Sequence, residues 1–344
     1  MLEGIDSNLA LQAATVTLGT LIAAQSLKTP NKVALKDSER SFTYQEFEKR
    51  TSQLANYLIK QGVVRGDRVA ILAENSLEYV ELLVAGSKVG AIIACQNWRL
   101  SQSELTHCVS LVEPKITFTS KRHAKTAKAL NLPTQVSVFN KALALEIGGC
   151  SDIAPLDTCE PEDGVVILYT SGTTGLPKGA LISHRAEIAR AQIQMLDLPA
   201  SPEDVFVAWA PLFHMVSTDT VYKTFMIGGT VMVTDGFDAQ ELAQIIATEK
   251  LGRLTLMPGM IAPIIDAVRS NGSKVKGIKW IGAMADLVPL EQIADVTALL
   301  NAPYLNTFGA TETGLAPATA GVIEIGEIAK TLDKTQSSLC QIKL

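Results

Sequence analysis

Short apolar runs alternate with longer amphipathic segments from about residue 43 to residue 308, and this alternation limits the folds open to the chain. Each short run has the composition of a buried strand, and each longer segment has the spacing of a helix with one apolar face. Strands that alternate with helices build parallel sheets covered by helices on both faces. Ten such runs suit two sheets better than one. The runs are 69–72, 91–95, 116–119, 136–139, 165–169, 205–209, 230–233, 254–257, 279–281 and 304–308.

Helix starts between these runs are marked by residues that commonly cap helices. Ser101 is followed three residues later by Glu104, which is the pattern of a capping box, and Asp238 begins a similar pattern. The two other predicted caps are Ser76 and Ser183. These signals place helices between the strands, as an α/β fold requires.

The composition is that of a globular protein without an unusual bias. The chain has 344 residues, of which 47% are hydrophobic and 19% charged, and this length is enough for more than one hydrophobic core. Lys and Arg number 30 against 35 Asp and Glu, and no basic cluster suggests a nucleic-acid partner. No apolar run reaches the ~20 residues of a membrane span, and the first residues lack the pattern of a signal peptide. We therefore expect a cytoplasmic protein with no nucleic-acid or membrane partner.

A loop dense in glycine and hydroxyl side chains follows the apolar run at 165–168. Its sequence over 169–179 is Tyr-Thr-Ser-Gly-Thr-Thr-Gly-Leu-Pro-Lys-Gly, in which glycines let backbone N–H groups surround an anion while hydroxyls and Lys178 donate to phosphate oxygens. A flexible linker is the alternative, but a linker seldom leaves a buried strand and leads straight into another apolar stretch. The P-loop of NTPases is excluded because Gly179, rather than Ser or Thr, follows the lysine. We predict a polyphosphate-binding loop.

Other motifs occur along the chain in a fixed order. They are Phe-Thr-Tyr at 42–44, Gly-Asp-Arg-Val-Ala-Ile at 66–71, Asn-Trp-Arg-Leu at 97–100, Ala-Pro-Leu-Phe-His at 210–214 and Asn-Thr-Phe-Gly-Ala-Thr-Glu at 306–312. Together with the loop, this series resembles the adenylate-forming (AMP-binding) superfamily, and is most like the N-terminal domain of an acyl-CoA synthetase or acid–CoA ligase.

The resemblance implies two flavodoxin-like α/β subdomains with parallel sheets packed face to face, over about 1–205 and 206–315, and the start of a small β-barrel over 316–344. It places the active site in the groove between the subdomains, at the carboxyl ends of the strands. The superfamily continues into a mobile C-terminal domain, and its ribose-binding aspartate, hinge and lysine have no counterpart here. We expect 1–344 to be the N-terminal adenylation domain, with that C-terminal domain absent and little activity alone.

The resemblance also assigns roles to single residues. It gives catalytic roles to Lys178, His214, Thr311 and Glu312, with Glu312 as the ligand of Mg²⁺. In the superfamily the loop binds the β- and γ-phosphates of ATP and the threonine bonds the α-phosphate. The residues that the resemblance assigns to nucleotide binding are Thr170, Ser171, Gly172, Thr173, Thr174, Gly175, Lys178, Gly282, Ala283, Met284, Asn306, Thr307, Phe308, Gly309, Ala310 and Thr311.

The acyl pocket is assigned in the same way. In acyl-CoA synthetases an aromatic residue or histidine follows Pro-Leu-Phe near the substrate carboxylate, whereas the amino-acid-activating branch usually has aspartate there. Because His214 occupies this position and no carboxylate follows before Asp219, we expect an acid without an α-amino group. A structural, hydrogen-bonding role for His214 is the alternative. The predicted substrate-binding residues are His214, Met215, Val216, Ser217, Met284 and Thr307.

We expect ATP-dependent activation of a carboxylic acid to an acyl-adenylate, followed in the full-length enzyme by thioester formation with CoA. The expected cofactors are ATP and Mg²⁺, with CoA as co-substrate, and the partners are small molecules. Formation of a homodimer is an alternative that the sequence does not decide. Two alternatives remain: an adenylation module that loads a carrier protein, and a non-catalytic relative that binds nucleotide or acyl groups.

Overall fold

A six-stranded sheet forms the first half of the framework. A computed structural model of the protein describes residues 15–171, 175–272, 274–307, 309–315 and 321–327. Neighbouring strands of this sheet are parallel, except that the last one runs antiparallel to the strand before it. Their order is β6 (Gln135–Val138), β5 (Ile116–Thr119), β3 (Arg68–Leu72), β4 (Ile92–Cys95), β7 (Gly164–Thr170) and β8 (Lys178–Ser183).

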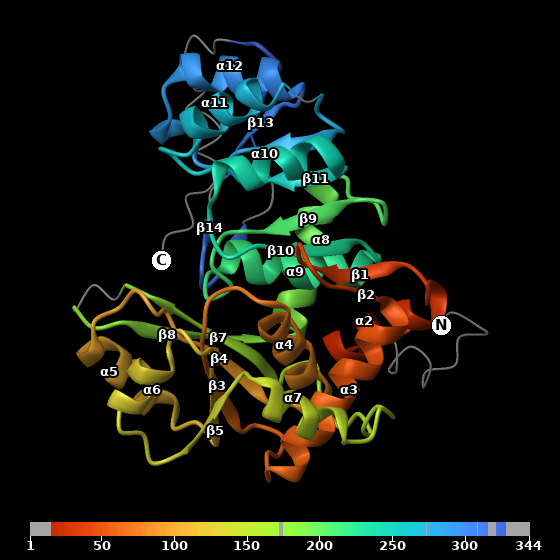
Figure 1. Cartoon of the computed structure of the whole chain (residues 1–344), viewed down its shortest axis with the longest axis vertical. Coiled ribbons are helices and arrows are strands. Elements are labelled where there is room, and N and C mark those ends of the chain that lie inside the picture. The colour runs from red at the N-terminus through yellow and green to blue at the C-terminus, as the bar shows by residue number, and fades with distance from the viewer. Residues whose placement is uncertain (1–14, 172–174, 273, 308, 316–320, 328–344) are drawn as a thin grey trace, which may run out of the picture.

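An eight-stranded sheet forms the second half and lies above the first in Figure 1. Its strands are parallel except for an antiparallel strand at each edge. Their order is β16 (Gly321–Ile323), β13 (Tyr304–Asn306), β12 (Ile278–Ile281), β11 (Leu251–Leu254), β9 (Val205–Ala208), β10 (Thr230–Val233), β1 (Val33–Lys36) and β2 (Ser41–Thr43). A short separate hairpin is formed by β14 (Gly309–Ala310) and β15 (Gly314–Leu315).

Helices cover the sheets, and the predicted caps are present at their starts. Ser101 and Glu104 form a complete capping box, and the Asp238 carboxylate accepts hydrogen bonds from two backbone N–H groups. Ser76 and Ser183 each accept one. The helices are α2 (Leu18–Lys28), α3 (Tyr44–Lys60), α4 (Leu77–Val89), α5 (Gln102–Val112), α6 (Ala124–Ala129), α7 (Lys141–Gly148), α8 (His184–Asp197), α9 (Met215–Ile227), α10 (Ala239–Thr248), α11 (Ile261–Asn271) and α12 (Leu290–Leu300), with a 3-10 turn at Ala285–Leu287.

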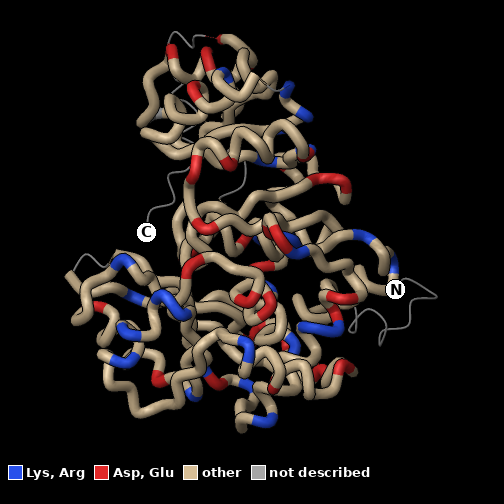
Figure 2. Tube along the Cα trace, viewed as in Figure 1, with Lys and Arg blue, Asp and Glu red and all other residues tan. Residues whose placement is uncertain are grey.

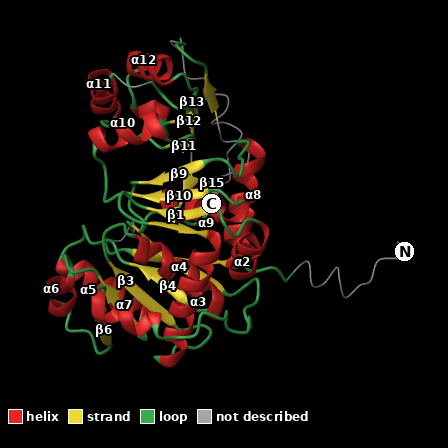
Figure 3. Cartoon of the chain, turned by 45° about the vertical axis from the view of Figure 1, so that its right-hand side comes forward, coloured by secondary structure: helices red, strands yellow, loops and turns green. Residues whose placement is uncertain are grey.

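The two sheets share a helical layer, in which α4 packs on the first sheet and α9 on the second (Figures 1 and 3). The Tyr222 hydroxyl of α9 donates to the Leu83 carbonyl of α4 across 3.2 Å, and both residues are fully buried. Phe225 of α9 stacks on Phe47 of α3 with ring centroids 4.7 Å apart. Burial of these large side chains removes apolar surface from water on both sides of the layer, and this holds the two sheets together.

The predicted α/β class with two largely parallel sheets is confirmed, with three differences in detail. The strand expected at 254–257 lies earlier, at Leu251–Leu254. The strands β1, β2 and β8 were not predicted. In the described part of 316–344, Gly321–Ile323 forms a strand that was not predicted and pairs with β13 at the edge of the second sheet, while the start of a barrel over 316–344 stays a prediction. The backbone groups of that edge are thereby satisfied.

The predicted boundary between the two subdomains near residue 205 stays a prediction. The strands before this residue do not all belong to the first sheet. Leu35 of β1 lies beside Val231 of β10, so a segment from the start of the chain belongs to the second sheet. The physical reason is that β10 has an edge whose backbone groups need a partner strand, and β1 pairs with this edge in parallel. The strand β2 then pairs antiparallel with β1 and becomes the last strand of the sheet.

Charged residues of both signs are interspersed along the chain, as Figure 2 shows. Among the described helices, none combines the length and apolarity that a membrane crossing requires.

Candidate active site

The predicted phosphate loop connects two antiparallel strands. Thr170 at the end of β7 lies opposite Lys178 at the start of β8, so the loop returns to its starting edge within a few residues. Gly175 has a φ of +92°, a conformation that glycine adopts without strain. Ser171 and Lys178 are exposed, as donors to a solvated phosphate must be. Predicted phosphate contacts at Gly172, Thr173 and Thr174 lie outside the described residues.

The loop meets the motif at 306–312 through a direct side-chain contact. The Thr170 hydroxyl donates to the Glu312 carboxylate, with 3.4 Å between Oγ1 and Oε1. Glu312 lies in the turn of the β14–β15 hairpin, and its side chain is exposed. Thr311 precedes it in the same turn. Three residues that the sequence assigned to the triphosphate and its metal are therefore neighbours in space.

A buried cluster of charged side chains holds the β14–β15 hairpin in place. Arg190 of α8 donates to the Thr311 carbonyl across 2.8 Å, and its other terminal nitrogen lies 3.5 Å from Asp219 and 4.0 Å from Glu187. Burial raises the pKa of Asp219 to about 6 and the pKa of Glu187 well above its usual range. The Arg190 guanidinium therefore neutralises only the Asp219 carboxylate, and the Glu187 side chain stays protonated. Gly314 is required here, because a Cβ would lie 2.8 Å from the Arg190 side chain.

Two further side chains support the loop from the first sheet. His107 of α5 lies 3.2 Å from the Pro177 carbonyl through Nε2. Tyr169 donates to the Cys108 carbonyl across 2.9 Å and accepts from Gln96 across 3.0 Å. These contacts hold both ends of the loop, which gives His107 a positioning role that the sequence did not reveal.

The segment 282–284 lies against β13 in a tightly constrained conformation. Gly282 has a φ of +84°, and a Cβ there would lie 2.1 Å from the Tyr304 ring, so no other residue fits. The Tyr304 hydroxyl donates to the Ala283 carbonyl across 2.9 Å. Met284 also has a positive φ, of 49°, which is rare for a residue with a long side chain and indicates local strain. Asn306 accepts from the Ala285 N–H across 3.0 Å and so holds this segment next to the motif.

A cavity of about 560 Å³, part of it open to solvent, lies beside these elements, and we call it the acyl cavity. It brings together most of the predicted pocket residues, with Gly309 and Leu315 of the β14–β15 hairpin on one wall. Sequence reasoning did not select Gln194, Arg253 or Met257 for this lining. The predicted residues that line it are His214, Met215, Val216, Ala283, Met284, Thr307 and Gly309.

His214 begins α9 and caps it. Its Nδ1 accepts from the Val216 N–H across 3.3 Å, so the ring has a structural role as well as a place on the cavity wall. Partial burial and the nearby Arg99 guanidinium lower the pKa of His214. The ring is therefore neutral at pH 7, with Nδ1 as acceptor and Nε2 as donor.

One predicted substrate contact is wrong. Ser217 does not line the acyl cavity, because its buried hydroxyl donates to the Ala210 carbonyl across 2.7 Å. The hydroxyl is turned back toward the segment before α9 and is 1% exposed, so it does not reach the cavity. The predicted adenine contact at Phe308 lies outside the described residues.

The residues present fit a magnesium ion that arrives with ATP rather than a resident metal. The described residues contain no group of three or more His, Cys, Asp or Glu side chains that could hold an ion alone. Mg²⁺ is commonly bound through one or two carboxylates plus the substrate phosphates, with water in the remaining positions. The exposed Glu312 carboxylate beside the phosphate loop could supply one such ligand.

Known proteins resemble this chain over most of its length. Indoleacetate–CoA ligase of Aromatoleum aromaticum is 29% identical over 299 residues, which are 83% of this chain and 58% of that protein. A linear gramicidin synthase of Brevibacillus parabrevis is 26% identical over 329 residues, which are 95% of this chain and 4% of that protein. Among solved structures, the N-terminal domain of FACL13 from Mycobacterium tuberculosis superposes with a TM-score of 0.80 at 22% identity, covering 87% of this chain and 77% of that one.

The chain spans little more than half the length of the ligase it matches. The profile of the family described as AMP-binding enzyme matches residues 22–338, which include the phosphate loop, the acyl cavity and the β14–β15 hairpin. The chain therefore belongs to the AMP-binding enzyme family.

Proposed function

We propose that this chain supplies the adenylating part of an acid–CoA ligase that uses ATP and Mg²⁺. In this reaction a carboxylate attacks the α-phosphate of ATP and releases pyrophosphate, and the thiol of CoA then displaces AMP. The observation that carries the proposal is the contact between Thr170 and Glu312, 3.4 Å apart, beside the acyl cavity. Family membership and the CoA ligase relative support it.

The charges at this junction suit a bound triphosphate. Lys178 and the Thr170 hydroxyl would donate to the β- and γ-phosphates, and Thr311 to the α-phosphate. A bound Mg²⁺ would neutralise phosphate charge, and Glu312 would hold it. Adenylation depends on positioning and on electrostatic stabilisation of charge at the α-phosphate, so these groups could perform most of the protein's part.

The acyl cavity suits a mainly apolar acid without an α-amino group. Met215, Val216 and Met284 contribute apolar surface. At the start of α9, where the substrate carboxylate would lie, the neutral His214 offers a hydrogen bond and no negative charge to pair with an ammonium group. Asp219 also lines the cavity, but its carboxylate is paired with Arg190.

An adenylation module that loads a carrier protein is the second candidate. The match to the linear gramicidin synthase favours it, because 95% of this chain aligns with only 4% of that much longer protein, as a module would. Both candidates form the same acyl-adenylate, so they differ only in the thiol that accepts the acyl group.

The direct experiment is acid-dependent exchange of labelled pyrophosphate into ATP, measured with a panel of carboxylic acids. We expect slow exchange, because little activity is expected of this part alone. The exchange should require Mg²⁺ and be lost in Glu312→Gln, while Glu324→Gln, at an exposed glutamate outside the site, behaves as the unmodified chain. Thioester formation with CoA against transfer to a carrier protein then separates the two candidates. Absence of exchange with every acid, together with no thermal stabilisation by any acyl-adenylate analogue although ATP binds, would favour a non-catalytic relative.

A further inference from the structure

A second cavity adjoins the acyl cavity along the same face of α9. We call it the distal cavity; the space in it that is open to a water-sized group measures about 30 Å³, and part of the cavity is open to solvent. Thr220 and Arg253 line both cavities and so form the boundary between them. Along α9, Val216 lines the acyl cavity, Thr220 lines both, and Lys223 lines the distal cavity, at the spacing of one helix face. A ligand that extends past Thr220 would enter the distal cavity.

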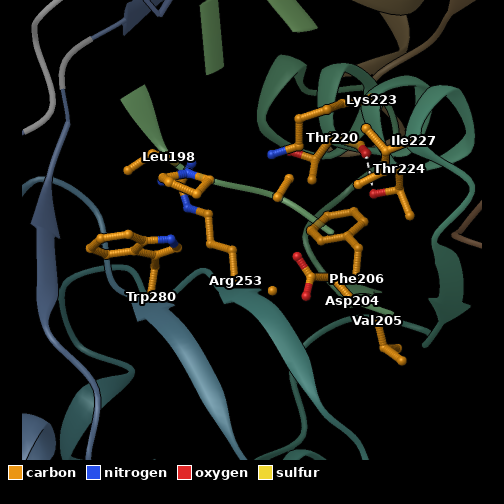
Figure 4. A pocket seen from close by; sticks show the side chains of 13 residues that line it. Leu198, Asp204, Val205, Phe206, Thr220, Lys223, Thr224, Ile227, Arg253 and Trp280 are labelled. Atoms are coloured by element: carbon orange, nitrogen blue, oxygen red, sulfur yellow. Dashed lines mark hydrogen bonds between the residues drawn. The ribbon is translucent and has the colours of Figure 1, made fainter. Parts of the chain in front are cut away.

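Three side chains with nitrogen donors line the distal cavity. Lys223, Arg253 and Trp280 reach it from α9, β11 and β12 (Figure 4). Lys223 is 7% exposed and Arg253 is 6% exposed. Within the described residues, neither cation has an ion pair, the Lys223 side chain has no hydrogen bond, and Arg253 Nε and Trp280 Nε1 have no acceptor. The Arg253 guanidinium donates only through Nη2, to Gly282 and Thr307 at 3.4 Å each.

The carboxylates that face this region already have partners. Asp204, on the cavity wall, lies 2.7 Å from Lys279 and accepts from the Ser201 N–H across 2.9 Å. Asp219, one turn before Lys223, is paired with Arg190. Both are close enough to attract the Lys223 ammonium, but neither lies within ion-pair distance of it.

Two buried cations that repel each other and lack counterions are costly in a folded protein. Burial and the neighbouring Arg253 lower the pKa of Lys223 to about 8. Burial lowers the pKa of Arg253 to about 10. A bound anion would remove this cost, because it would accept from Lys223 Nζ, Arg253 Nε and Trp280 Nε1 together.

We propose that the acid activated by this chain carries a second carboxylate at its far end, which the distal cavity binds through Lys223, Arg253 and Trp280. This inference rests on the proposed function, because it takes the acyl cavity as the seat of the reacting end. Lys223 lies nine residues after His214 on α9, or about 13 Å along the axis, and its side chain leans back toward the helix start. The two carboxylates of the substrate are therefore expected to be about 10 Å apart.

The test is calorimetry of straight-chain α,ω-dicarboxylic acids against monocarboxylic acids of equal carbon number. Measurements at pH 7 use the unmodified chain, Lys223→Met, Lys223→Arg and a control, Lys60→Met, at an exposed lysine outside the site. We expect one diacid length to bind the unmodified chain at least about tenfold more tightly than its monoacid. This preference should disappear in Lys223→Met, persist in Lys60→Met and be retained in part by Lys223→Arg, while affinity for monoacids stays unchanged or rises.

Equal binding of diacids and monoacids, no measurable binding by any acid, or a diacid preference that survives in Lys223→Met would overturn the inference. Pyrophosphate exchange on the same panel separates this failure from failure of the proposed function. If only monoacids support pyrophosphate exchange, the proposed acid activation is supported and the proposal of a diacid substrate is wrong. If diacids bind but no acid supports exchange, the distal cavity is supported as a carboxylate site and the proposed ligase reaction is contradicted.

Discussion

Thr170 and Glu312 are separated by 142 positions in the sequence, yet the hydroxyl of one donates to the carboxylate of the other across 3.4 Å. The contact joins the end of β7 in the first sheet to the β14–β15 hairpin that follows the last parallel strand of the second. A ligand that binds between these residues would touch both halves of the molecule. The junction therefore couples the geometry of the phosphate loop to that of the acyl cavity.

Glu312→Gln removes the carboxylate charge while keeping the shape of the side chain. We expect the affinity for ATP in the presence of Mg²⁺ to fall about tenfold or more, because a charged ligand of the ion is lost. Calorimetry of ATP with and without Mg²⁺ measures the effect. AMP affinity and the melting temperature should not change, and an equal loss of AMP binding would assign Glu312 to another part of the nucleotide.

Lys178→Met tests the phosphate loop from its other end. Lys178 is exposed and begins β8, so its removal should leave the fold intact. Loss of a charge-assisted contact of roughly 1.5–3 kcal/mol should weaken ATP binding while sparing AMP, which lacks the β- and γ-phosphates. Titration of both nucleotides on this variant and on Lys60→Met decides it. Equal weakening of ATP and AMP would contradict a triphosphate role.

His214 carries two roles that substitutions can separate. His214→Ala removes the cap of α9 and should lower the free energy of unfolding by about 1 kcal/mol. His214→Asn keeps a capping acceptor and should restore that stability. If His214 also contacts the reacting acid, both variants should alter acid selectivity in pyrophosphate exchange at unchanged ATP affinity. Normal selectivity in His214→Asn would leave His214 with the structural role alone.

Lys223 should make the stability of the ligand-free protein depend on pH. Its folded pKa of about 8 lies below its ordinary value of 10.5, so the folded state releases a proton that the unfolded state keeps. The cost of the buried ammonium is fully present below pH 8 and is relieved as pH rises towards 10.5, by on the order of 3 kcal/mol. Lys223→Met should raise the free energy of unfolding at pH 7 and remove this gain at alkaline pH. Denaturant unfolding across pH measures both, and an unchanged profile in the variant would show that Lys223 is not the titrating group.

Most of the parallel strands were predictable because they fall in short, mainly apolar runs bounded by turn or cap residues. Strands β1 and β2 escaped prediction because they are short strands at one side of their sheet, and the pairing of β1 with β10 depends on tertiary contacts far along the chain. The strand β8 escaped it because its apolar stretch has only three residues, at 180–182, in a segment that is mostly exposed or half-buried.

Site residues that belong to sequence motifs were predictable, whereas residues whose roles depend on their burial were not. The loop at 169–179 and the motif at 306–312 indicated Thr170 and Glu312 directly. Arg190 and Lys223 had no such signal, since each shares its helix with other charged residues and lies in no motif. Their roles follow only from being buried, which sequence periodicity cannot distinguish from a solvated helix face.

The pairing of β1 with β10 has a consequence for how the chain is made. The Thr230 hydroxyl donates to the Val33 carbonyl, and the two residues are 197 positions apart. At ~5–20 residues per second, a ribosome needs roughly 10–40 s to deliver the partner after Val33 has been made. During that interval β1 and β2 have no sheet to join, and their unpaired backbone groups are open to other chains. A nascent protein of this kind therefore needs protection by chaperones until Thr230 has been made, which is after the phosphate loop and His214 but before the β14–β15 hairpin.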